Sequence, residues 1–321
     1  MSASSPGVAD ARAESFRLAD GTGNRFLLWR RDGERAHPDG GGVAPQVLAP
    51  RVCEAFEVDG LLQLAPPSDP TCALAMILHN ADGGRAEMCG NGLRIVACAW
   101  HDGRGAGRTV GEPLRIETDA GVRDAWPLPD ADGIARRARV SLGKPRLLAQ
   151  DEALRTGATT LLAHLVDVGN PHCVVFVGDL ARVDVARTGA ALERHPRFPA
   201  RTNVEFVERT PTGLRLRVWE RGVGETASCG SGVVAAAYAH TVVHGRGRLG
   251  APAGSEATER TPGPEGSTRV ETRGGPLAVS FSGDEALLEG PARIRALDEA
   301  ERVRLVTLLE DARTGAPSTR G

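Results

Sequence analysis

Short runs of alternating or β-branched apolar residues occur along most of the chain. Because successive side chains of a strand point to opposite faces of a sheet, such runs predict strands. The predicted strands cover residues 26–29, 61–64, 73–78, 114–117, 139–142, 161–168, 173–177, 203–207, 214–219, 269–272, 278–281 and 286–288.

Apolar residues spaced three and four positions apart predict helices over 92–101, 183–192, 232–243 and 298–312. The last of these is expected to bury a stripe formed by Val303, Val306, Leu308 and Leu309. Residues 1–14, 35–50 and 251–268 are rich in Gly, Pro, Ser and charge, which predicts loops, with 1–14 and 251–268 flexible. Many strands and a few separated helices predict an α+β protein in which two helices are each wrapped by their own strands.

Composition narrows the possible partners of the protein. A chain of 321 residues with 41% hydrophobic content can form two lobes, and a formal net charge of −2 argues against nucleic acid and favours a small-molecule substrate. No apolar run is long enough to cross a membrane, and residues 1–14 lack the pattern of an export signal. The six cysteines are scattered without a CxxC pair, which predicts reduced thiols in the cytoplasm.

Lysine chemistry is almost excluded, because Lys144 is the only lysine. A pyridoxal phosphate enzyme needs a lysine for its Schiff base, and a P-loop needs one beside the phosphates. Lys144 lies in a Gly-Lys-Pro turn after a predicted strand and is expected to be a solvated surface residue. We therefore expect chemistry without a cofactor, and we expect no metal site.

The strongest signal is a short motif that occurs twice. Residues 88–94 read Met-Cys-Gly-Asn-Gly-Leu-Arg, and residues 228–234 read Ser-Cys-Gly-Ser-Gly-Val-Val, each at the start of a predicted helix. A polar residue at a strand end precedes each cysteine by nine positions: Asn80 precedes Cys89, and Glu220 precedes Cys229. Both halves therefore read strand, polar residue, glycine-bearing loop, cysteine, helix.

This arrangement suits the inversion of a stereocentre by proton transfer. The positive end of a helix macrodipole is expected to lower the pKa of a cysteine placed there, and the glycine amides can bind a carboxylate. A thiolate from one motif and a thiol from the other could serve as base and acid on opposite faces of one α-carbon. The remaining cysteines lie in or beside apolar runs and are expected to be inert buried residues: Cys53, Cys72, Cys98 and Cys173.

These motifs resemble those of the diaminopimelate epimerase family. The chain has Asn-Ala-Asp-Gly at 80–83, the motif at 88–94, Gly-Asn-Pro-His at 169–172 and Glu-Arg-Gly-Val-Gly-Glu-Thr-Ala-Ser-Cys-Gly-Ser-Gly at 220–232. Further matches at 21–24, 198–199, 203–204 and 290–291 extend the resemblance over roughly residues 18 to 295.

The resemblance implies epimerisation of LL-2,6-diaminopimelate to the meso form, with Cys89 and Cys229 as the two acid/base thiols. It implies that backbone amides cradle the reacting carboxylate at Gly90, Asn91, Gly230 and Ser231. It implies a polar set for the far end of the substrate, in which Glu220 takes the ammonium group: Asn24, Asn80, Asn170, Asn203, Glu220 and Arg221. His172 is either an electrostatic neighbour of the thiols or a structural histidine that hydrogen-bonds the backbone.

The resemblance also implies two pseudo-symmetric lobes, each a curved mixed sheet around a central helix, with the site between them. The expected boundaries are 15–130 for the lobe that carries Cys89 and 131–290 for the lobe that carries Cys229. Residues 291–321 are expected to return to the first lobe. Family members commonly form homodimers, so a homodimer is expected.

Alternatives remain open at this point. Proline racemases normally carry histidine where this chain has Asn91, which argues against them. The family's usual Gly-Asn-Asp-Phe reads Gly-Asn-Arg-Phe here, so Arg25 either points to solvent or signals a changed substrate. A racemase of another polar amino acid and a non-catalytic binder are the remaining hypotheses.

Overall fold

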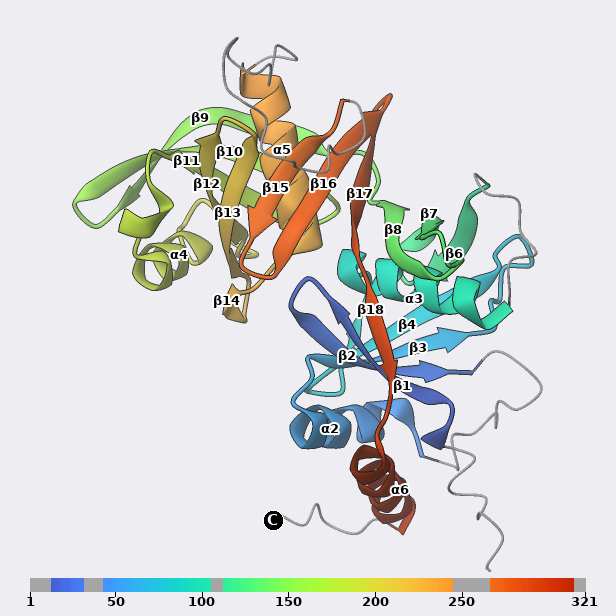
Figure 1. The fold of residues 1–321 in the computed structure, drawn as a ribbon. Coiled ribbons are helices and arrows are strands. Elements are labelled where there is room, and N and C mark those ends of the chain that lie inside the picture. The colour runs from blue at the N-terminus through green and yellow to red at the C-terminus, as the bar shows by residue number, and fades with distance from the viewer. Residues whose placement is uncertain (1–12, 32–42, 105–111, 245–265, 315–321) are drawn as a thin grey trace, which may run out of the picture. The chain divides into compact units, whose positions relative to one another are not determined.

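The computed structural model describes residues 13–31, 43–104, 112–244 and 266–314. The chain divides into two compact units, Met1–Ala138 with Pro291–Gly321 and Arg139–Gly290, each taken here over its described residues. Each unit combines a mixed sheet with a long helix, so the fold is α+β (Figure 1). No helix in the described ranges is long and apolar enough to cross a membrane.

The N-terminal unit is built on a sheet with strand order β18-β1-β2-β3-β4-β6-β7. β2 and β3 are parallel, as are β4 and β6, and these connections contain α2 and α3 respectively. The strands are β1 (Phe16–Gly21), β2 (Asn24–Arg30), β3 (Gly60–Ala65), β4 (Leu74–Asn80), β5 (Arg85–Ala86), β6 (Leu114–Thr118), β7 (Gly121–Pro129) and β18 (Arg293–Ala296). The helices are α2 (Pro45–Phe56), α3 (Gly90–Arg104) and α6 (Glu299–Thr314).

The C-terminal unit is built on a sheet with strand order β9-β10-β11-β12-β13-β15-β16-β17. Its strands are β9 (Arg146–Thr156), β10 (Thr159–Asp167), β11 (Pro171–Val177), β12 (Asn203–Thr210), β13 (Gly213–Glu220), β14 (Gly224–Thr226), β15 (Thr268–Thr272), β16 (Gly275–Ser282) and β17 (Glu285–Pro291). Its helices are η1 (Leu180–Arg182), α4 (Val185–Glu193) and α5 (Gly230–His244), and β8 (Ala135–Ser141) spans the boundary between the units.

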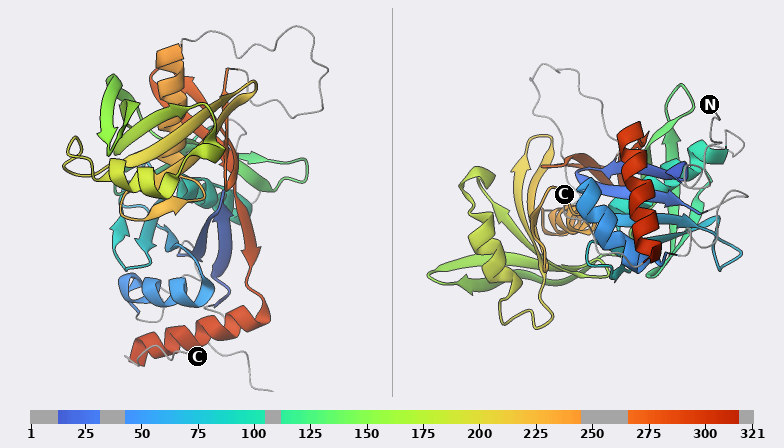
Figure 2. Two further views of the ribbon diagram at one scale, coloured as in Figure 1. Left: turned by 90° about the vertical axis from the view of Figure 1, so that its left-hand side faces the viewer. Right: turned by 90° about the horizontal axis from the view of Figure 1, so that it is seen from below.

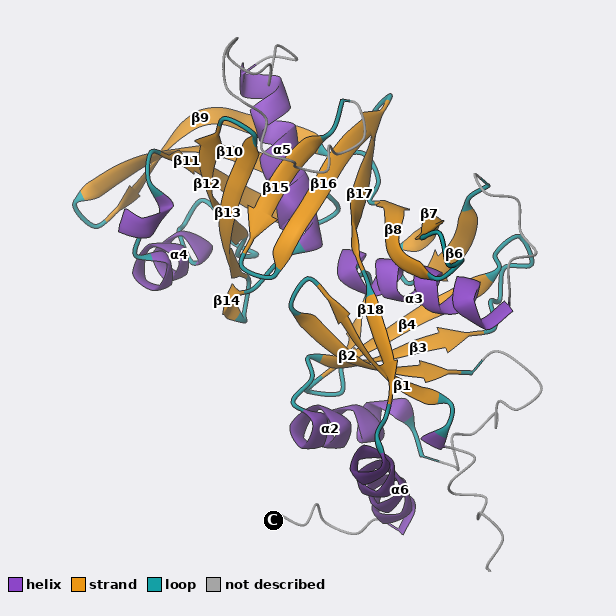
Figure 3. Cartoon of the chain, in the orientation of Figure 1, coloured by secondary structure: helices purple, strands orange, loops and turns teal. Residues whose placement is uncertain are grey.

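The two units repeat one chain path. The series β1-β2-α2-β3-β4-β5-α3-β6-β7 has the same pairings as β10-β11-α4-β12-β13-β14-α5-β15-β16. The register agrees as well, because Phe26 lies opposite Gly60 in the first parallel pair and His172 lies opposite Asn203 in the second. α3 and α5 are therefore equivalent helices, each packed against the strands of its own unit (Figure 3).

Apolar side chains explain where these helices pack. α5 is buried along its first half, where Val233, Val234 and the alanines at 235–237 are inaccessible to solvent. In the N-terminal unit, α2 and α6 lie side by side and contribute Leu48, Leu305 and Leu309 to one core (Figure 2).

Each predicted strand and helix is confirmed to within a few residues, and the side chain of Lys144 is exposed as expected. Two expectations are wrong. Residues 45–50, predicted as loop, begin α2, because Pro45 occupies the first turn, where its missing N–H costs nothing, and because Leu48 is buried. Val303, predicted in the buried stripe of the last helix, is 60% exposed, and Leu305 is buried instead. The segments expected to be flexible, 1–14 and 251–268, lie almost entirely outside the described residues.

Candidate functional site

Each of the two equivalent helices begins at a glycine that directly follows a cysteine, so Cys89 and Cys229 are the N-cap residues of α3 and α5. The carbonyl oxygen of Cys89 accepts the first helical hydrogen bond from Leu93 at 2.9 Å, and that of Cys229 accepts one from Val233 at 2.9 Å. An N-cap side chain lies beside the free N–H groups of the first turn. The repeated motif therefore gives each sulfur the same backbone surroundings.

Each sulfur accepts a hydrogen bond from the third residue of its helix. The Gly92 N–H donates to Cys89 Sγ at 3.4 Å, and the Gly232 N–H donates to Cys229. Hydrogen bonds of this kind favour the charged form of the acceptor. The start of each helix therefore gives its sulfur one hydrogen bond that favours the thiolate.

The second glycine of each motif allows the helix to approach the sheet closely. A Cβ atom on Gly92 would lie 3.3 Å from Leu62 Cδ1, whereas a Cβ atom on Gly232 would lie 2.6 Å from Glu205 Oε1. Leu62 and Glu205 occupy equivalent positions of β3 and β12. A buried leucine of one unit is thus replaced in the other by a buried glutamate.

In the N-terminal unit, a row of polar side chains crosses the start of α3. The Asn91 amide donates to Asn24 Oδ1, the Thr22 hydroxyl lies 3.5 Å from Asn91 Oδ1, and Arg94 Nη2 donates to Thr22 Oγ1 at 3.0 Å. Asn24 also lies 3.5 Å from a carboxylate oxygen of Asp59. The side-chain amide of Asn91 is therefore hydrogen-bonded within the protein.

Arg94 was not singled out from the sequence, although it ends the first motif. Its side chain is fully buried, and burial lowers its pKa to about 10, against the opposing influence of Cys89, Cys98 and Asp20. Among the described residues, its Nη1 has no hydrogen-bond partner. Val234 stands at the equivalent place in the C-terminal unit, so the buried cation belongs to one unit only.

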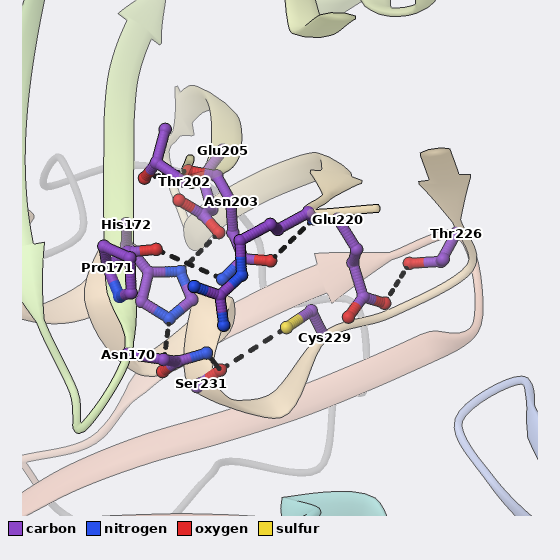
Figure 4. Close-up of polar contacts among 11 residues, drawn as sticks. Asn170, Pro171, His172, Thr202, Asn203, Glu205, Glu220, Thr226, Cys229 and Ser231 are labelled. Atoms are coloured by element: carbon purple, nitrogen blue, oxygen red, sulfur yellow. Dashed lines mark hydrogen bonds and ion pairs between the residues drawn. The ribbon is translucent and has the colours of Figure 1, made fainter. Parts of the chain in front are cut away.

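In the C-terminal unit, polar side chains form a connected row beside Cys229 (Figure 4). The Cys229 sulfur lies 3.5 Å from Ser231 Oγ, and that oxygen accepts a hydrogen bond from the Asn170 amide at 3.3 Å. His172 lies 2.9 Å from Asn170 Oδ1 through Nε2 and 2.7 Å from Glu205 Oε1 through Nδ1. The histidine thus connects the Asn170 amide to a buried carboxylate.

His172 and Glu205 form a fully buried pair, with both side chains at 0% exposure. The ring contacts side chains, so the interpretation of His172 as a residue that hydrogen-bonds the backbone is not supported. In the N-terminal unit, Phe26 occupies the position equivalent to His172, and Leu62 occupies the position equivalent to Glu205. Glu205 was missed from the sequence, although a glutamate within the apolar run 203–207 was a usable signal.

The environment of Cys229 corrects one expectation. The helix start was predicted to lower its pKa, but burial, followed by the negative charges of Glu220 and Glu205, raises the pKa well above its ordinary value. Hydrogen bonds from Ser231 and Gly232 offset this only in part. The desolvation of an ionised sulfur outweighs the helix dipole here, so Cys229 holds its proton at neutral pH.

Glu220 ends β13 next to this thiol. Its carboxylate accepts a hydrogen bond from the Thr226 hydroxyl at 2.5 Å. Burial raises the pKa of Glu220, although hydrogen bonds from Thr226 and Cys229 act in the opposite direction. Asn80, at the equivalent end of β4, is exposed and bears no charge. The two strand ends therefore differ in both charge and burial.

Asn203 and Arg221 meet at the turn after β13. Asn203 donates to the carbonyl oxygen of Pro171 at 3.1 Å and accepts the Arg221 backbone N–H at 2.9 Å. The exposed Arg221 side chain reaches the carbonyl oxygen of Ala200 at 3.3 Å. Asn203 thus holds the backbone of the arginine that the sequence predicted as a substrate contact.

The predicted site residues fall into two groups, one in each unit. Asn24, Asn80, Cys89, Gly90 and Asn91 belong to the N-terminal unit. The C-terminal unit holds Asn170, His172, Asn203, Glu220, Arg221, Cys229, Gly230 and Ser231.

Arg25, the departure from the family motif, is exposed at the surface of the N-terminal unit. Its backbone N–H donates to the Asp59 carboxylate at 2.7 Å. This placement favours the interpretation that its side chain points to solvent.

Comparison with known proteins gives consistent results. A family model described as diaminopimelate epimerase matches residues 164–294. The diaminopimelate epimerase of Pelotomaculum thermopropionicum is 39% identical over 240 residues, which cover 70% of this chain and 82% of that protein. The diaminopimelate epimerase of an Azoarcus species is 38% identical over 293 residues, which cover 86% of this chain and 95% of that protein.

A solved structure shares the fold at much lower sequence identity. The hydroxyproline epimerase of Agrobacterium vitis superposes with a TM-score of 0.62 at 16% identity, covering 89% of this chain and 92% of that one. At this level of identity the likeness establishes the fold alone.

Proposed function

Because this chain belongs to the diaminopimelate epimerase family, we propose that it is an isomerase that converts LL-2,6-diaminopimelate to the meso form by a two-thiol mechanism. The observation that supports this most strongly is the duplicated helix start, in which two cysteines cap equivalent helices. Inversion needs one proton acceptor and one proton donor, and the duplicated motif supplies two groups of the same chemistry.

The proposed reaction begins with the Cys89 thiolate and the Cys229 thiol. The reacting carboxylate lies against the backbone amides at Gly90, Asn91, Gly230 and Ser231. Cys89 removes the α-proton, and the electron pair of the broken C–H bond moves into the carboxylate, which the amide donors stabilise as an enediolate. Cys229 then donates its proton to the opposite face of the carbon and becomes the thiolate. The reverse reaction exchanges the roles, and the raised pKa of Cys229 supports its part as the initial donor.

The far end of diaminopimelate carries a second carboxylate and a second ammonium group. We assign the carboxylate to the guanidinium of Arg221 and the ammonium to Glu220, because these side chains have complementary charge. Amide groups complete this set at Asn24, Asn80, Asn170 and Asn203. His172 acts through Asn170, whose carbonyl oxygen it contacts.

We also assign the protein to the cytoplasm, as a homodimer that supplies a precursor of lysine and peptidoglycan. All six cysteines are free thiols, which supports a reducing compartment. The dimer rests on the resemblance to the family.

The proposal is tested with purified protein and LL-diaminopimelate, by following the meso product on a chiral column and α-proton exchange in D₂O. Cys89→Ala and Cys229→Ala should each lower turnover by roughly 10³-fold, because each removes one proton carrier. Cys72→Ala, which changes a buried cysteine outside the motif, should keep normal turnover.

Near-normal turnover in either motif variant would exclude the two-thiol mechanism. Turnover of another polar amino acid, with none of LL-diaminopimelate, would overturn the substrate and leave the chemistry standing. Absence of α-proton exchange with both kinds of substrate would indicate a non-catalytic binder.

A further inference from the structure

A buried carboxylate lies beneath the turn that carries Arg221. Glu193 is the last residue of α4, and its side chain is only 3% exposed. One carboxylate oxygen, Oε2, accepts the indole N–H of Trp219 at 2.9 Å. The other, Oε1, accepts the backbone N–H of Gly222 at 2.9 Å and lies 3.5 Å from Arg201 Nη1.

Two side chains from different elements therefore accept hydrogen bonds from successive backbone N–H groups of this turn. Asn203, at the start of β12, accepts the N–H of Arg221, and Glu193 accepts the N–H of Gly222. The turn closes with a hydrogen bond from the Val223 N–H to the Glu220 carbonyl oxygen at 3.1 Å. Gly222 has a φ of 78°, a backbone conformation that glycine adopts without strain.

The surroundings give Glu193 little freedom to move. Burial of its carboxylate raises the pKa, but hydrogen bonds from Trp219 and Gly222 and the charge of Arg201 more than offset this, so the pKa lies below its ordinary value. Trp219 also packs closely against α4 one turn before Glu193, because a Cβ atom on Gly189 would lie 2.6 Å from Trp219 Cβ. A buried carboxylate that satisfies several donors in fixed positions orders all the groups that it contacts.

We propose that Glu193 is a positioning residue that fixes the Arg221 turn and thereby tightens substrate binding. The inference rests on the proposed function, in which Arg221 binds the second carboxylate of diaminopimelate. Glu193 accepts hydrogen bonds from Trp219 and Gly222, which lie on either side of Glu220 and Arg221 in the chain. It therefore acts on the substrate through Arg221.

The first test is the KM of Glu193→Gln for LL-diaminopimelate. A glutamine has one acceptor oxygen, so it cannot serve the donors of both Trp219 and Gly222, and it loses the attraction to Arg201. We expect KM to rise roughly 10-fold, the effect of one lost hydrogen bond to a charged group, with kcat within about 2-fold. Glu152→Gln is the matched control, because Glu152 pairs with Arg197, which lies in the same 194–202 segment as Arg201, and among the described residues no hydrogen bond or ion pair joins Glu152 to the turn. The KM of this variant should not change.

The second test is amide hydrogen exchange in the free enzyme, which needs no activity. Peptides that cover 219–225 should exchange faster in Glu193→Gln than in the unchanged protein or in Glu152→Gln. The third test is a double-mutant cycle with Arg221→Met. If Glu193 acts through Arg221, adding Glu193→Gln to Arg221→Met should raise KM no further.

Failure of this inference can be told apart from failure of the proposed function. Unchanged exchange in 219–225 would show that Glu193 does not hold the turn, and effects that multiply in the cycle would show that it does not act through Arg221. Either result overturns the inference while catalysis remains normal. If the unchanged protein does not act on diaminopimelate, the proposed function fails, and the exchange measurement still decides whether Glu193 fixes the turn.

Discussion

The two helix-start cysteines have similar backbones around them but different buried charges nearby. The C-terminal unit places Glu205 and His172 beneath its helix, whereas the N-terminal unit has apolar side chains at both positions. The N-terminal unit instead buries Arg94. A buried anion favours the protonated form of a nearby thiol, and a buried cation favours the thiolate. Glu205 and Arg94, which were not predicted as site residues, therefore make the two half-sites electrostatically different.

The raised pKa of Cys229 predicts a measurable pH dependence. In a Cys89→Ser variant, alkylation of Cys229 by iodoacetamide should stay slow at neutral pH, because the thiol keeps its proton, and should rise only above about pH 9. Adding Glu220→Gln removes a negative charge and should move the midpoint to lower pH by about one unit. Mass spectrometry of the modified peptide gives both profiles. A midpoint near pH 7 in the single variant would show that the helix dipole dominates after all.

The sequence located both cysteines but not the residues that tune or support them. The motif fixes Cys89 and Cys229 because a helix start has a local signature of glycines before an apolar run. Glu205 and Glu193 act through contacts with distant segments, namely His172 for the first and Gly222 for the second. Local patterns cannot reveal such partners, because they arise only when strands and helices pack.

At the level of elements, close packing of helix on sheet distinguishes the two units. α5 approaches β12 so closely that Gly232 touches Glu205, and the glutamate is held in turn by His172. α3 approaches β3 at Gly92, where the neighbours are the flexible ends of Leu62 and Met76. The same substitution should therefore have different consequences in the two helices.

We predict that Gly232→Ala destabilises the protein by about 1 to 3 kcal/mol, because the new methyl group would overlap the immobile carboxylate of Glu205. Gly92→Ala should cost less, since its contacts at 3.3 Å are with side-chain ends that can shift, and alanine favours the helix. Thermal unfolding followed by circular dichroism measures both. Equal losses of stability would mean that the side chain of Glu205 shifts to make room as easily as that of Leu62 does.

Element prediction succeeded where the hydrophobic pattern was strong and failed where pairing or packing decides the structure. The predicted strands form because their apolar faces are buried. The strand 293–296 has one half-buried apolar side chain, Ile294, and is defined by its pairing with β1. β9 alternates only weakly and reads as polar, and α2 was hidden by Pro45 and Pro50, which usually mark loops.

At the scale of the whole molecule, the chain leaves the N-terminal unit, builds the C-terminal unit and then returns. β18 pairs with β1, and α6 packs beside α2, so the last described residues complete the first unit. Leu305 and Leu309 of α6 are buried in the same core as Leu48. The stability of the N-terminal unit therefore depends on residues from both ends of the chain.

We predict that Leu305→Ala lowers the free energy of unfolding by about 2 to 5 kcal/mol, since it opens a cavity in this core. Val303→Ala, on the exposed side of the same helix, should change stability by less than about 0.5 kcal/mol. Hydrogen exchange should rise within the N-terminal unit and remain unchanged in Arg139–Gly290. Increased exchange spread over both units would show that they unfold as one body.

The return of the chain has a consequence for synthesis on the ribosome. Residues Arg139–Gly290 are contiguous, so the whole of that unit has been translated before β18 is made. β1 can pair with β2 early, but its other edge has no partner until β18 has been synthesised. The C-terminal unit is therefore the first that can complete its fold, although its translation begins after that of the N-terminal unit. The N-terminal unit keeps an open sheet edge at β1 until β18 has been made.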